Sequence, residues 1–476
     1  MKNKSLLKSF FNFSIGNWLG AIVGIISTPI LTRILSPDQL GKASMFTLAI
    51  NILLLFVLFG TDQAFVRFFY EEEENNRNKL LFNILKIPIF IFLITSIIIF
   101  FMKDRISIFL FGEVNQFLII TLIITLFFNV LKRYGLLVIR MKQQGLTYSM
   151  LNFLFKIISL GLLILFAYLL GEQFEIRVYS QSIAIIIITF ISIFISRKAW
   201  KFTDFKDIKL NNSLKDIFHY SYPLMFTALI TWLFQSFDKL AIKEWSTYNQ
   251  LGLYSAAFKI VAILNIVKAS FTNFWVPTSL EKYEDDSNNA NFFSNMYQLI
   301  FLVMFFVGLG TIAFKDLIVN LLGSEYRTAS MIMPFLVFMP IMYTISETTV
   351  IGINFKKKPK YHILIASVAC VVNIIGNYFL VPELGAKGAA ISTGFSYIVF
   401  FIMRTVISLK FFKVDYKLYK SFILIFILFI YALYSSFFVY NYLNSIIACF
   451  IFFIVFIINY KYIRRIYLRL KDELNK

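Results

Sequence analysis

Long apolar blocks separated by short polar loops repeat along the whole chain. Almost every block has about 20 residues, the length that an α-helix needs to cross the hydrocarbon core of a membrane. Alternating strands of about ten residues, typical of a membrane barrel, are not found in the sequence. The pattern predicts an all-α polytopic membrane protein, because backbone polar groups in lipid must bond within the helix. About fourteen spans are expected, near 10–33, 43–70, 80–101, 115–139, 147–170, 176–196, 214–236, 250–277, 296–314, 330–353, 361–381, 388–411, 416–437 and 444–462.

The composition fits this pattern, and the charge adds a direction to it. The chain has 476 residues, of which 59% are hydrophobic, and a formal net charge of +20. In a soluble protein such a charge would suggest nucleic acid. Here the loops on one side of the membrane, with both termini, hold 33 Lys and Arg, and the opposite loops hold 10. The positive-inside rule therefore places both termini in the cytoplasm, and no nucleic-acid partner is expected.

The few cysteines and histidines exclude several kinds of site. Cys370 and Cys449 both lie in apolar spans and are interpreted as small core residues. His219 and His362 lie in different spans, so neither a metal site nor a cofactor is expected. The sequence also lacks a phosphate-binding loop of the ATP-driven pumps.

Three short matches indicate an internal duplication. NFS at 12–14 matches HYS at 219–221, QLGKAS at 39–44 matches QLGLYS at 250–255, and the basic turn KQQG at 142–145 matches KKKP at 356–359. Because six spans is an even number, the two repeats would have the same orientation in the membrane, as in many transporters that work by alternating access. The predicted parts are a first six-helix lobe (1–198), a cytoplasmic linker (199–213), a second six-helix lobe (214–412), and two additional spans with a basic tail (413–476).

Three lysines lie deep inside predicted spans, at least nine residues from either end, where charges usually face a wet cavity. Lys156 belongs to a polar stripe of the fifth span, and it lies about 13 Å from the nearer end of the helix. Lys259 and Lys268 are nine residues apart, so a continuous helix would direct them to opposite sides. Lys259 is the favoured cavity cation of the two. The stripe around Lys156 also includes Ser149, Asn152 and Ser159.

Other polar groups within the spans are candidates for lining the same cavity. One face of the seventh span is polar, although hydrogen bonds between helices explain such a face equally well. Three acids, Asp62, Asp238 and Glu347, are candidates for binding a coupling ion, and Glu347 could also pair with a lysine. The further lining candidates are Thr227, Thr231, Gln235, Asn373 and Asn377.

Several segments resemble bacterial polysaccharide flippases of the multidrug/oligosaccharidyl-lipid/polysaccharide exporter superfamily. They are ILTRILSPDQLGKASMF in the first spans, GTDQAFVRFF at the end of the second, NQLGLYSAAFKI in the second lobe, and LVPELGAKGAAIST at 380–393. Within GTDQAFVRFF, Arg67 is the cation that best matches the family pattern. None of the segments is a catalytic signature, so they indicate the superfamily rather than its substrate.

The resemblance implies a fold like that of multidrug and toxic compound extrusion (MATE) transporters, and no enzymatic activity. It also implies a cargo of undecaprenyl-pyrophosphate-linked oligosaccharide, moved across the bacterial cytoplasmic membrane for surface polysaccharide synthesis. Membrane lipids are then partners, and a polysaccharide polymerase with other assembly proteins are potential ones. In this interpretation Lys156 and Lys259, with Arg67 and Lys268 as further candidates, pair with the pyrophosphate. A drug or cation exporter, a lipid II flippase and, less favoured, a membrane glycosyltransferase are the alternatives.

Overall fold

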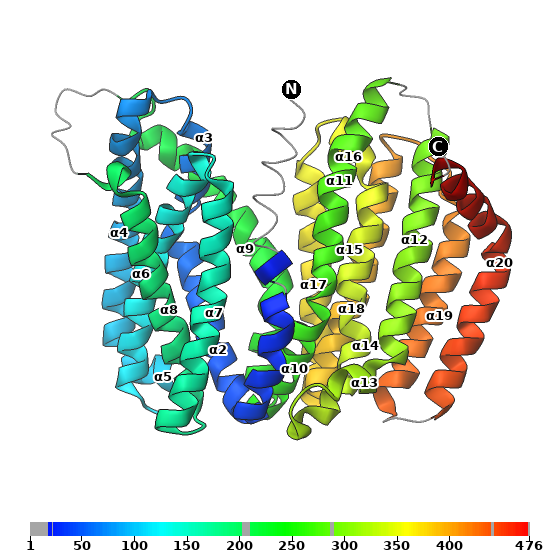
Figure 1. Ribbon diagram of the computed structural model, residues 1–476, viewed down its shortest axis with the longest axis horizontal. Helices are drawn as coiled ribbons and strands as arrows, with labels where there is room; N and C mark the ends of the chain where they lie inside the picture. The colour runs from blue at the N-terminus through cyan, green and yellow to red at the C-terminus, as the bar shows by residue number, and fades with distance from the viewer. Residues whose placement is uncertain (1–17, 21, 202–209, 286–289, 439–441, 475–476) are drawn as a thin grey trace. The chain divides into compact units, whose positions relative to one another are not determined.

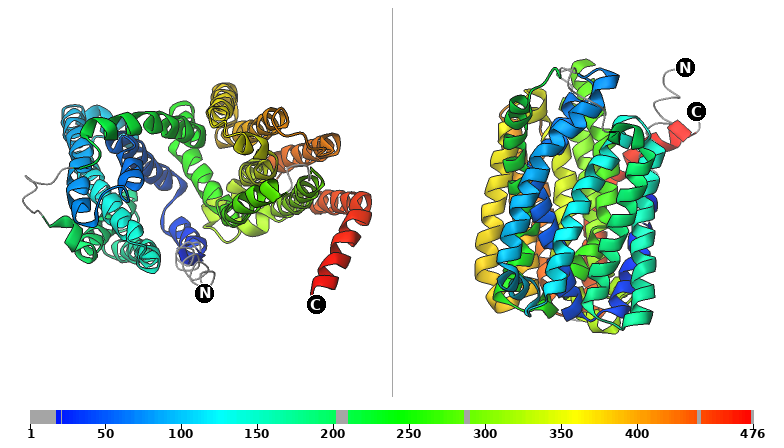
Figure 2. Two further views of the ribbon diagram at one scale, coloured as in Figure 1. Left: turned by 90° about the horizontal axis from the view of Figure 1, so that it is seen from above. Right: turned by 90° about the vertical axis from the view of Figure 1, so that its left-hand side faces the viewer.

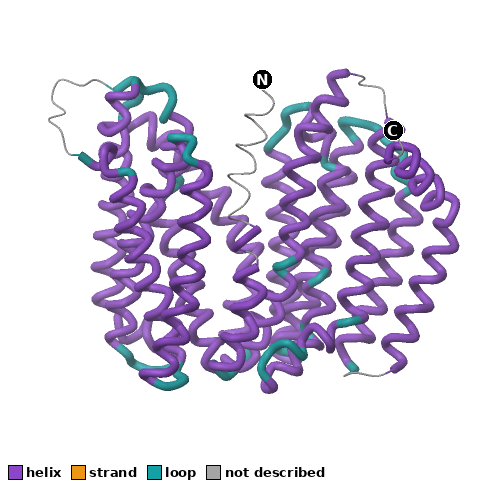
Figure 3. The backbone as a smooth tube through the Cα atoms, viewed as in Figure 1, coloured by secondary structure: helices purple, strands orange, loops and turns teal. Residues whose placement is uncertain are grey.

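The computed structural model describes residues 18–20, 22–201, 210–285, 290–438 and 442–474. All regular secondary structure in these residues is helical (Figure 3), which confirms the predicted all-α class. Eleven of the described helices are long and apolar enough to cross a membrane, or up to thirteen if each of two bent pairs forms one span. A further apolar helix covers Trp18–Ile34, and the earlier part of the first predicted span lies outside the described residues.

The chain forms two compact units, Met1–Ile266 (unit 1) and Val267–Lys476 (unit 2). They meet in the sequence within α11 (Leu264–Asp285), whereas the sequence repeat predicts a boundary at 199–213. Residues 202–209 of that linker lie outside the described part, and the lobe boundaries stay a prediction. The helices of unit 1 (Figure 1, blue to green) are α2 (Pro37–Leu58), α3 (Thr61–Phe68), η1 (Glu74–Asn76), α4 (Arg77–Phe101), α5 (Lys103–Phe111), α6 (Gln116–Met141), α7 (Gly145–Leu170), α8 (Phe174–Ile195), η2 (Arg197–Trp200), α9 (Leu214–Trp245) and α10 (Tyr248–Val261).

Two of the predicted spans that begin in unit 1 are broken. The second ends its long helix at Leu58, and α3 begins only after Phe59 and Gly60, which both have positive φ. Glycine tolerates this left-handed conformation well, whereas phenylalanine adopts it at some strain. The eighth is interrupted after Val261, where α10 and α11 meet at an angle of 43°. The side chains of each short helix therefore point in directions that a continuous helix would not give them.

Helix α2 lies in the middle of unit 1 and packs against α4, α6, α8 and α10. Both α2 and α10 start in the same way: the side chains of Ser36 and Thr247 accept hydrogen bonds from the backbone amides of Gln39 and Gln250. Such N-caps satisfy amides that the first turn of a helix leaves free. The sequence match QLGKAS/QLGLYS thus corresponds to two helix starts with the same local structure.

Unit 2 contains the remaining helices, which the left view of Figure 2 shows nearly end-on. Helices α17 and α18 form its closest pair, joined by a tight turn at Gly385, where φ is 55°. The helices are α12 (Ala290–Ala313), α13 (Lys315–Val319), η3 (Ser324–Met331), α14 (Met333–Leu336), α15 (Phe338–Thr349), α16 (Ile351–Phe355), α17 (Lys360–Leu384), α18 (Ala386–Leu409), α19 (Leu418–Phe437) and α20 (Tyr442–Leu474).

The two basic turns of the repeat also share one backbone structure. Gln143 and Lys357 occupy equivalent positions, and their φ angles are 59° and 51°. The next amide in each turn, of Gln144 or Lys358, donates to the carbonyl of the residue five positions earlier, at 3.2 and 3.0 Å. The left-handed conformation is uncommon for residues other than glycine. Its presence at the equivalent position of both turns is strong support for a common origin of the two turns.

Candidate functional site

Three cations from three helices gather inside unit 1. Lys259 of α10 interacts electrostatically with Arg177 of α8 and with Lys239 of α9. All three side chains are half-buried. Like charges at close range in a poorly solvated place repel one another strongly. This cluster, called the unit 1 cation cluster below, is therefore suited to an anion that would relieve the repulsion.

Neighbouring polar and aromatic groups hold the cluster in place. Arg177 Nη1 donates to Ser159 Oγ of α7 at 3.0 Å, and Lys239 Nζ lies 5.4 Å from the centre of the Phe258 ring. The nearest acid along the sequence, Asp238, acts electrostatically on Lys239 and accepts a 2.6 Å hydrogen bond from the Tyr254 hydroxyl. One carboxylate beside three cations leaves the cluster with an excess of positive charge.

Lys156 has a different environment from Lys259. Its Nζ donates a 2.7 Å hydrogen bond to the carbonyl oxygen of Gly20. Within the same predicted stripe, Asn152 donates to the carbonyl of Tyr148 at 2.9 Å, one turn earlier in α7. The ammonium of Lys156 is thus already engaged by the backbone, and the stripe contributes to the cation cluster through Ser159.

The polar face of α9 bonds largely within its own helix. Thr227 donates to the carbonyl of Pro223, and Thr231 to that of Thr227, at 3.0 and 2.9 Å. Threonine in a helix often bonds this way, so these bonds do not by themselves indicate a ligand. Gln235 is exposed. A role of this face in lining a cavity stays a prediction.

The end of the second predicted span holds two separate ion pairs. Asp62 Oδ2 accepts hydrogen bonds from Arg133 Nε at 3.1 Å and from Arg133 Nη2 at 2.6 Å, which joins α3 to α6. Arg67 lies on the exposed side of α3 and pairs with Glu71 at 2.5 Å. Arg67 therefore has an acidic partner one turn away, and Asp62 has a cation that the sequence analysis did not consider.

Unit 2 contains a second charged cluster, centred on Glu347. Its Oε1 lies 2.8 Å from Arg404 Nη1 of α18, and both side chains are buried. Arg404 also donates to Ser346 Oγ at 2.7 Å. Lys268 lies with its Nζ 3.4 Å from the centre of the Tyr343 ring, a cation–π contact. Glu347 thus pairs with an arginine, while Lys268 acts on it electrostatically from farther away.

Lys259 and Lys268 were expected to point to opposite sides of one helix, and the helix on which this expectation depends is not continuous. The chain bends by 43° between α10 and α11. Lys259 belongs to unit 1 and Lys268 to unit 2.

Asn373 and Asn377 join α17 to α18. Asn377 Nδ2 donates to the carbonyl of Asn373 at 2.9 Å, and Ser392 of α18 donates to the same carbonyl at 2.8 Å. Both asparagines are fully buried. Buried polar side chains that bond to a neighbouring helix stabilise helix packing in a membrane, and the role of the two asparagines toward a ligand stays a prediction.

The sequence analysis missed four cations that the structure places in polar clusters. It assigned them to loops because each lies within several residues of a predicted span end, where the sequence cannot say whether a long side chain turns inward or toward water. Arg177 could have been found by asking which way the charged residues at the span ends point, because it lies at the start of the predicted span 176–196. The four are Arg133, Arg177, Lys239 and Arg404.

Among the described residues, no group of three or more His, Cys, Asp or Glu side chains could hold a metal ion.

Comparison of the sequence with family models identifies its family. The model of the polysaccharide biosynthesis protein family matches residues 6–281, more than half of the chain. The chain belongs to this family. No curated protein matches the sequence significantly.

Solved structures with the same fold are a flippase and several multidrug transporters. Lipid II flippase MurJ in an inward closed conformation has a TM-score of 0.70 at 17% identity, covering 95% of this chain and 99% of that chain. An inward-facing MATE family transporter has 0.60 at 16%, covering 84% and 97%. The Vibrio cholerae MATE transporter VcmN, as a mutant, has 0.57 at 16%, covering 86% and 97%. At such low identity the likeness establishes the fold, which is the one expected from the sequence resemblance.

Proposed function

We propose that this protein is a flippase that moves undecaprenyl-pyrophosphate-linked oligosaccharide across the bacterial cytoplasmic membrane by alternating access. The observation that carries the proposal is the unit 1 cation cluster, Arg177, Lys239 and Lys259. A pyrophosphate carries negative charges and several acceptor oxygens on a small volume. Proteins bind such a group most strongly through charge-assisted hydrogen bonds from Lys and Arg.

The cluster favours an anionic cargo over a cationic one. A drug exporter that binds organic cations needs acids at its site, whereas here Lys259 interacts with two further cations, and the carboxylate that acts on Lys239, Asp238, is already bonded to Tyr254. Membership of the polysaccharide biosynthesis family supports a glycan on the cargo. Lipid II also carries a pyrophosphate, so the cluster alone fits both cargoes and the experiment must compare them.

The proposed orientation follows from the loops. The excess of Lys and Arg on one side supports cytoplasmic termini and seven extracytoplasmic loops. Polymerases and other proteins of surface polysaccharide assembly would then receive the cargo on the far side.

A proteoliposome assay tests the proposal. The purified full-length chain is reconstituted with a fluorescent undecaprenyl-pyrophosphate oligosaccharide, and a membrane-impermeant quencher reports the label that reaches the outer leaflet. Parallel liposomes carry labelled lipid II or a fluorescent organic cation, and the products are analysed for new glycosidic bonds. We expect transfer of the oligosaccharide without new bonds.

Variants connect the activity to the cluster. Lys259→Met should slow transfer by roughly tenfold to a hundredfold, since a charge-assisted hydrogen bond contributes about 1.5–3 kcal/mol. Lys259→Arg should retain most of the rate, and Lys410→Met, which removes an exposed lysine of unit 2, serves as the matched control. Equal rates for Lys259→Met and the control at equal protein abundance would contradict the proposal, as would transfer of the organic cation alone.

A further inference from the structure

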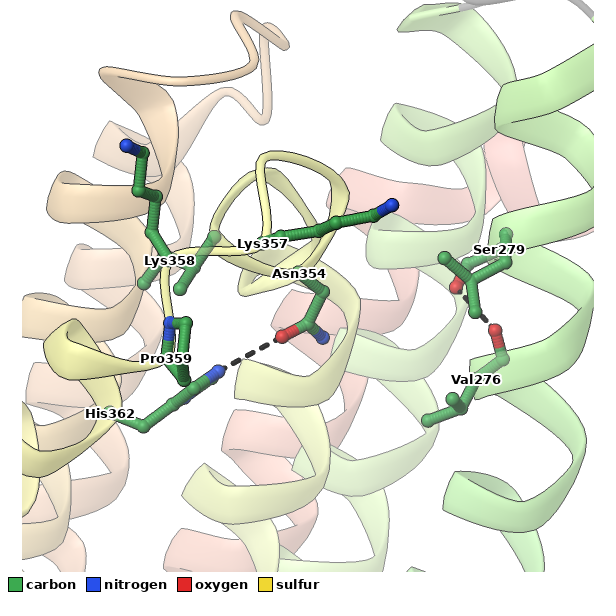
Figure 4. A pocket seen from close by; sticks show the side chains of 9 residues that line it. Val276, Ser279, Asn354, Lys357, Lys358, Pro359 and His362 are labelled. Atoms are coloured by element: carbon green, nitrogen blue, oxygen red, sulfur yellow. Dashed lines mark hydrogen bonds between the residues drawn. The ribbon is translucent and has the colours of Figure 1, made fainter.

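Unit 2 has a cavity of about 400 Å³ at the turn between α16 and α17. One wall is α11, which contributes Ser279, and the other is the turn itself with the first part of α17 (Figure 4). The polar side chains that line it are Ser279, Asn354, Lys357, Lys358 and His362. All of them belong to unit 2, and none of them is part of the unit 1 cation cluster.

A hydrogen bond orients the amide of Asn354 toward the cavity. The Oδ1 atom of Asn354 lies 2.9 Å from His362 Nε2, which is the donor since the carbonyl oxygen can only accept. With its oxygen held on the His362 side, Asn354 presents its Nδ2 donors on the other side, toward α11 (Figure 4). The cavity thus has an amide donor in a fixed position.

The backbone of the turn sets the direction of Lys357. This residue is in the left-handed region, with φ 51°, which is unusual for a side chain other than glycine or asparagine. From there its side chain extends toward α11, whereas that of Lys358 takes another direction (Figure 4).

The equivalent turn of unit 1 has the same backbone structure but different side chains. It has the same left-handed residue and the same hydrogen bonds, but Gln143 and Gln144 stand where unit 2 has Lys357 and Lys358. Tyr148 stands in the place of His362. The backbone path of the turn therefore does not require Lys357 and Lys358. The positive-inside rule accounts for basic residues in a cytoplasmic loop, but it does not account for a cavity and an oriented amide beside them.

One residue of the cavity also interacts electrostatically with a buried ion pair of unit 2. His362 interacts electrostatically with both members of the buried Arg404–Glu347 pair. The first turn of α17 adds the partial positive charge of a helix start. All these contributions, apart from Glu347, favour an anion.

We propose that this cavity is a binding site for a phosphate or pyrophosphate group, held by Lys357 and the Asn354 amide with Lys358 and His362 beside it. The group could come from a phospholipid head group, from the lipid-linked cargo or from solution, since the recognising chemistry is the same. The site does not depend on the proposed transport activity, because it is defined by binding alone.

Isothermal titration tests the site. The full-length protein and each variant carry Lys259→Met, so that the unit 1 cation cluster contributes little binding, and this parent protein is the unchanged protein of the comparison. The proteins are placed in nanodiscs of phosphatidylcholine, and inorganic pyrophosphate is added at low salt, where attraction between charges is little screened. The Lys357→Ala/Lys358→Ala variant should weaken binding by roughly tenfold or more. Asn354→Asp, which replaces the amide donor by a carboxylate of the same shape, should weaken it as well. The matched control is Lys410→Ala/Lys413→Ala, which removes two exposed lysines just after α18 and outside the cavity.

A second arm identifies the source of the phosphate. Nanodiscs containing phosphatidylglycerol are titrated in the same way. Their negative surface repels pyrophosphate from every variant alike, so only a fold-loss of binding that is larger for the unchanged protein than for the cavity variant means that a lipid head group occupies the cavity. An equal fold-loss for both proteins means that the site takes phosphate from solution or cargo, and both results support the proposal. It is overturned if the unchanged protein binds no pyrophosphate in either arm, or if the control pair weakens binding as much as the cavity pair. Loss of transport without loss of pyrophosphate binding would concern the proposed function only.

Discussion

Gly41 of α2 lies directly against the backbone carbonyl of Tyr248 at the start of α10, so closely that a Cβ atom at position 41 would overlap it. The contact has a counterpart: Gly252 of α10 lies in the same way against the carbonyl of Pro37 at the start of α2. Gly41 corresponds to Gly252, and Pro37 to Tyr248, in the sequence repeat. Each helix start thus packs its glycine against the other's first residue, the reciprocal contact that a local two-fold relationship produces.

The reciprocal contact predicts which glycines can be replaced. Gly41→Ala and Gly252→Ala should each destabilise the protein by about 1–3 kcal/mol, because an inserted methyl group meets rigid backbone. Gly161→Ala in α7 is the control, since nothing lies within 4 Å of its Cβ position, and the change should be neutral or stabilise by up to about 1 kcal/mol. Thermal unfolding of the purified variants measures all three. A melting temperature of Gly41→Ala equal to that of Gly161→Ala would contradict the contact.

The buried pair Glu347–Arg404 predicts a large effect from removing one partner. Arg404→Leu should destabilise the protein by about 3–5 kcal/mol, because Glu347 would keep a buried charge without its partner. Adding Glu347→Gln to this variant should restore part of the stability. The unchanged protein, Arg404→Leu, Glu347→Gln and the double variant form a double-mutant cycle, measured by chemical or thermal unfolding. Strictly additive effects would show that the two side chains do not interact.

The environments of Lys156 and Lys259 predict different contributions to transport. Lys156→Met should slow transfer of the labelled oligosaccharide less than Lys259→Met does, because the ammonium of Lys156 already donates to the Gly20 carbonyl. Lys259 instead interacts electrostatically with two other cations, Arg177 and Lys239. The rates are compared in proteoliposomes at matched protein content. The reverse order would mean that Lys156 is the main contact of the anion.

The pairing of Asp62 predicts a structural rather than an ion-coupling role. Asp62→Asn should lower stability by about 1 kcal/mol, a modest value because Arg133 is partly exposed and solvent weakens the pair. An imposed proton or sodium gradient should drive transfer in this variant as well as in the unchanged protein. If the variant alone lost its response to the gradient, Asp62 would be the coupling acid.

The sequence predicted the fold class well because lipid imposes a simple pattern on it. Each span needs enough apolar residues, and seven of the fourteen predicted spans agree with a helix of the structure to within three residues at both ends, as 147–170 does with α7. The breaks at Phe59–Gly60 and after Val261 were missed, since packing of neighbouring helices decides where a long apolar stretch bends. The repeat was visible in three short matches and extends to cap and turn geometry.

Side-chain partners were harder to predict than spans. Ser159 was recognised as polar within its span, but its partner Arg177 was assigned to a loop. Glu347 was expected to bind an ion or pair with a lysine, and it pairs with Arg404. A sequence places residues along one helix, whereas these partners depend on the rotation of a second helix against the first.

The left-handed turns at Gln143 and Lys357 show how a duplicated chain can divide its tasks. Both copies keep the bend that returns one helix into the next, so neither depends on the other for its shape. The two turns differ in their side chains while sharing one backbone, so a change of side chains alone is enough to give one turn a different surface. In such a protein, comparing equivalent positions of the two halves shows which residues one half has and the other lacks.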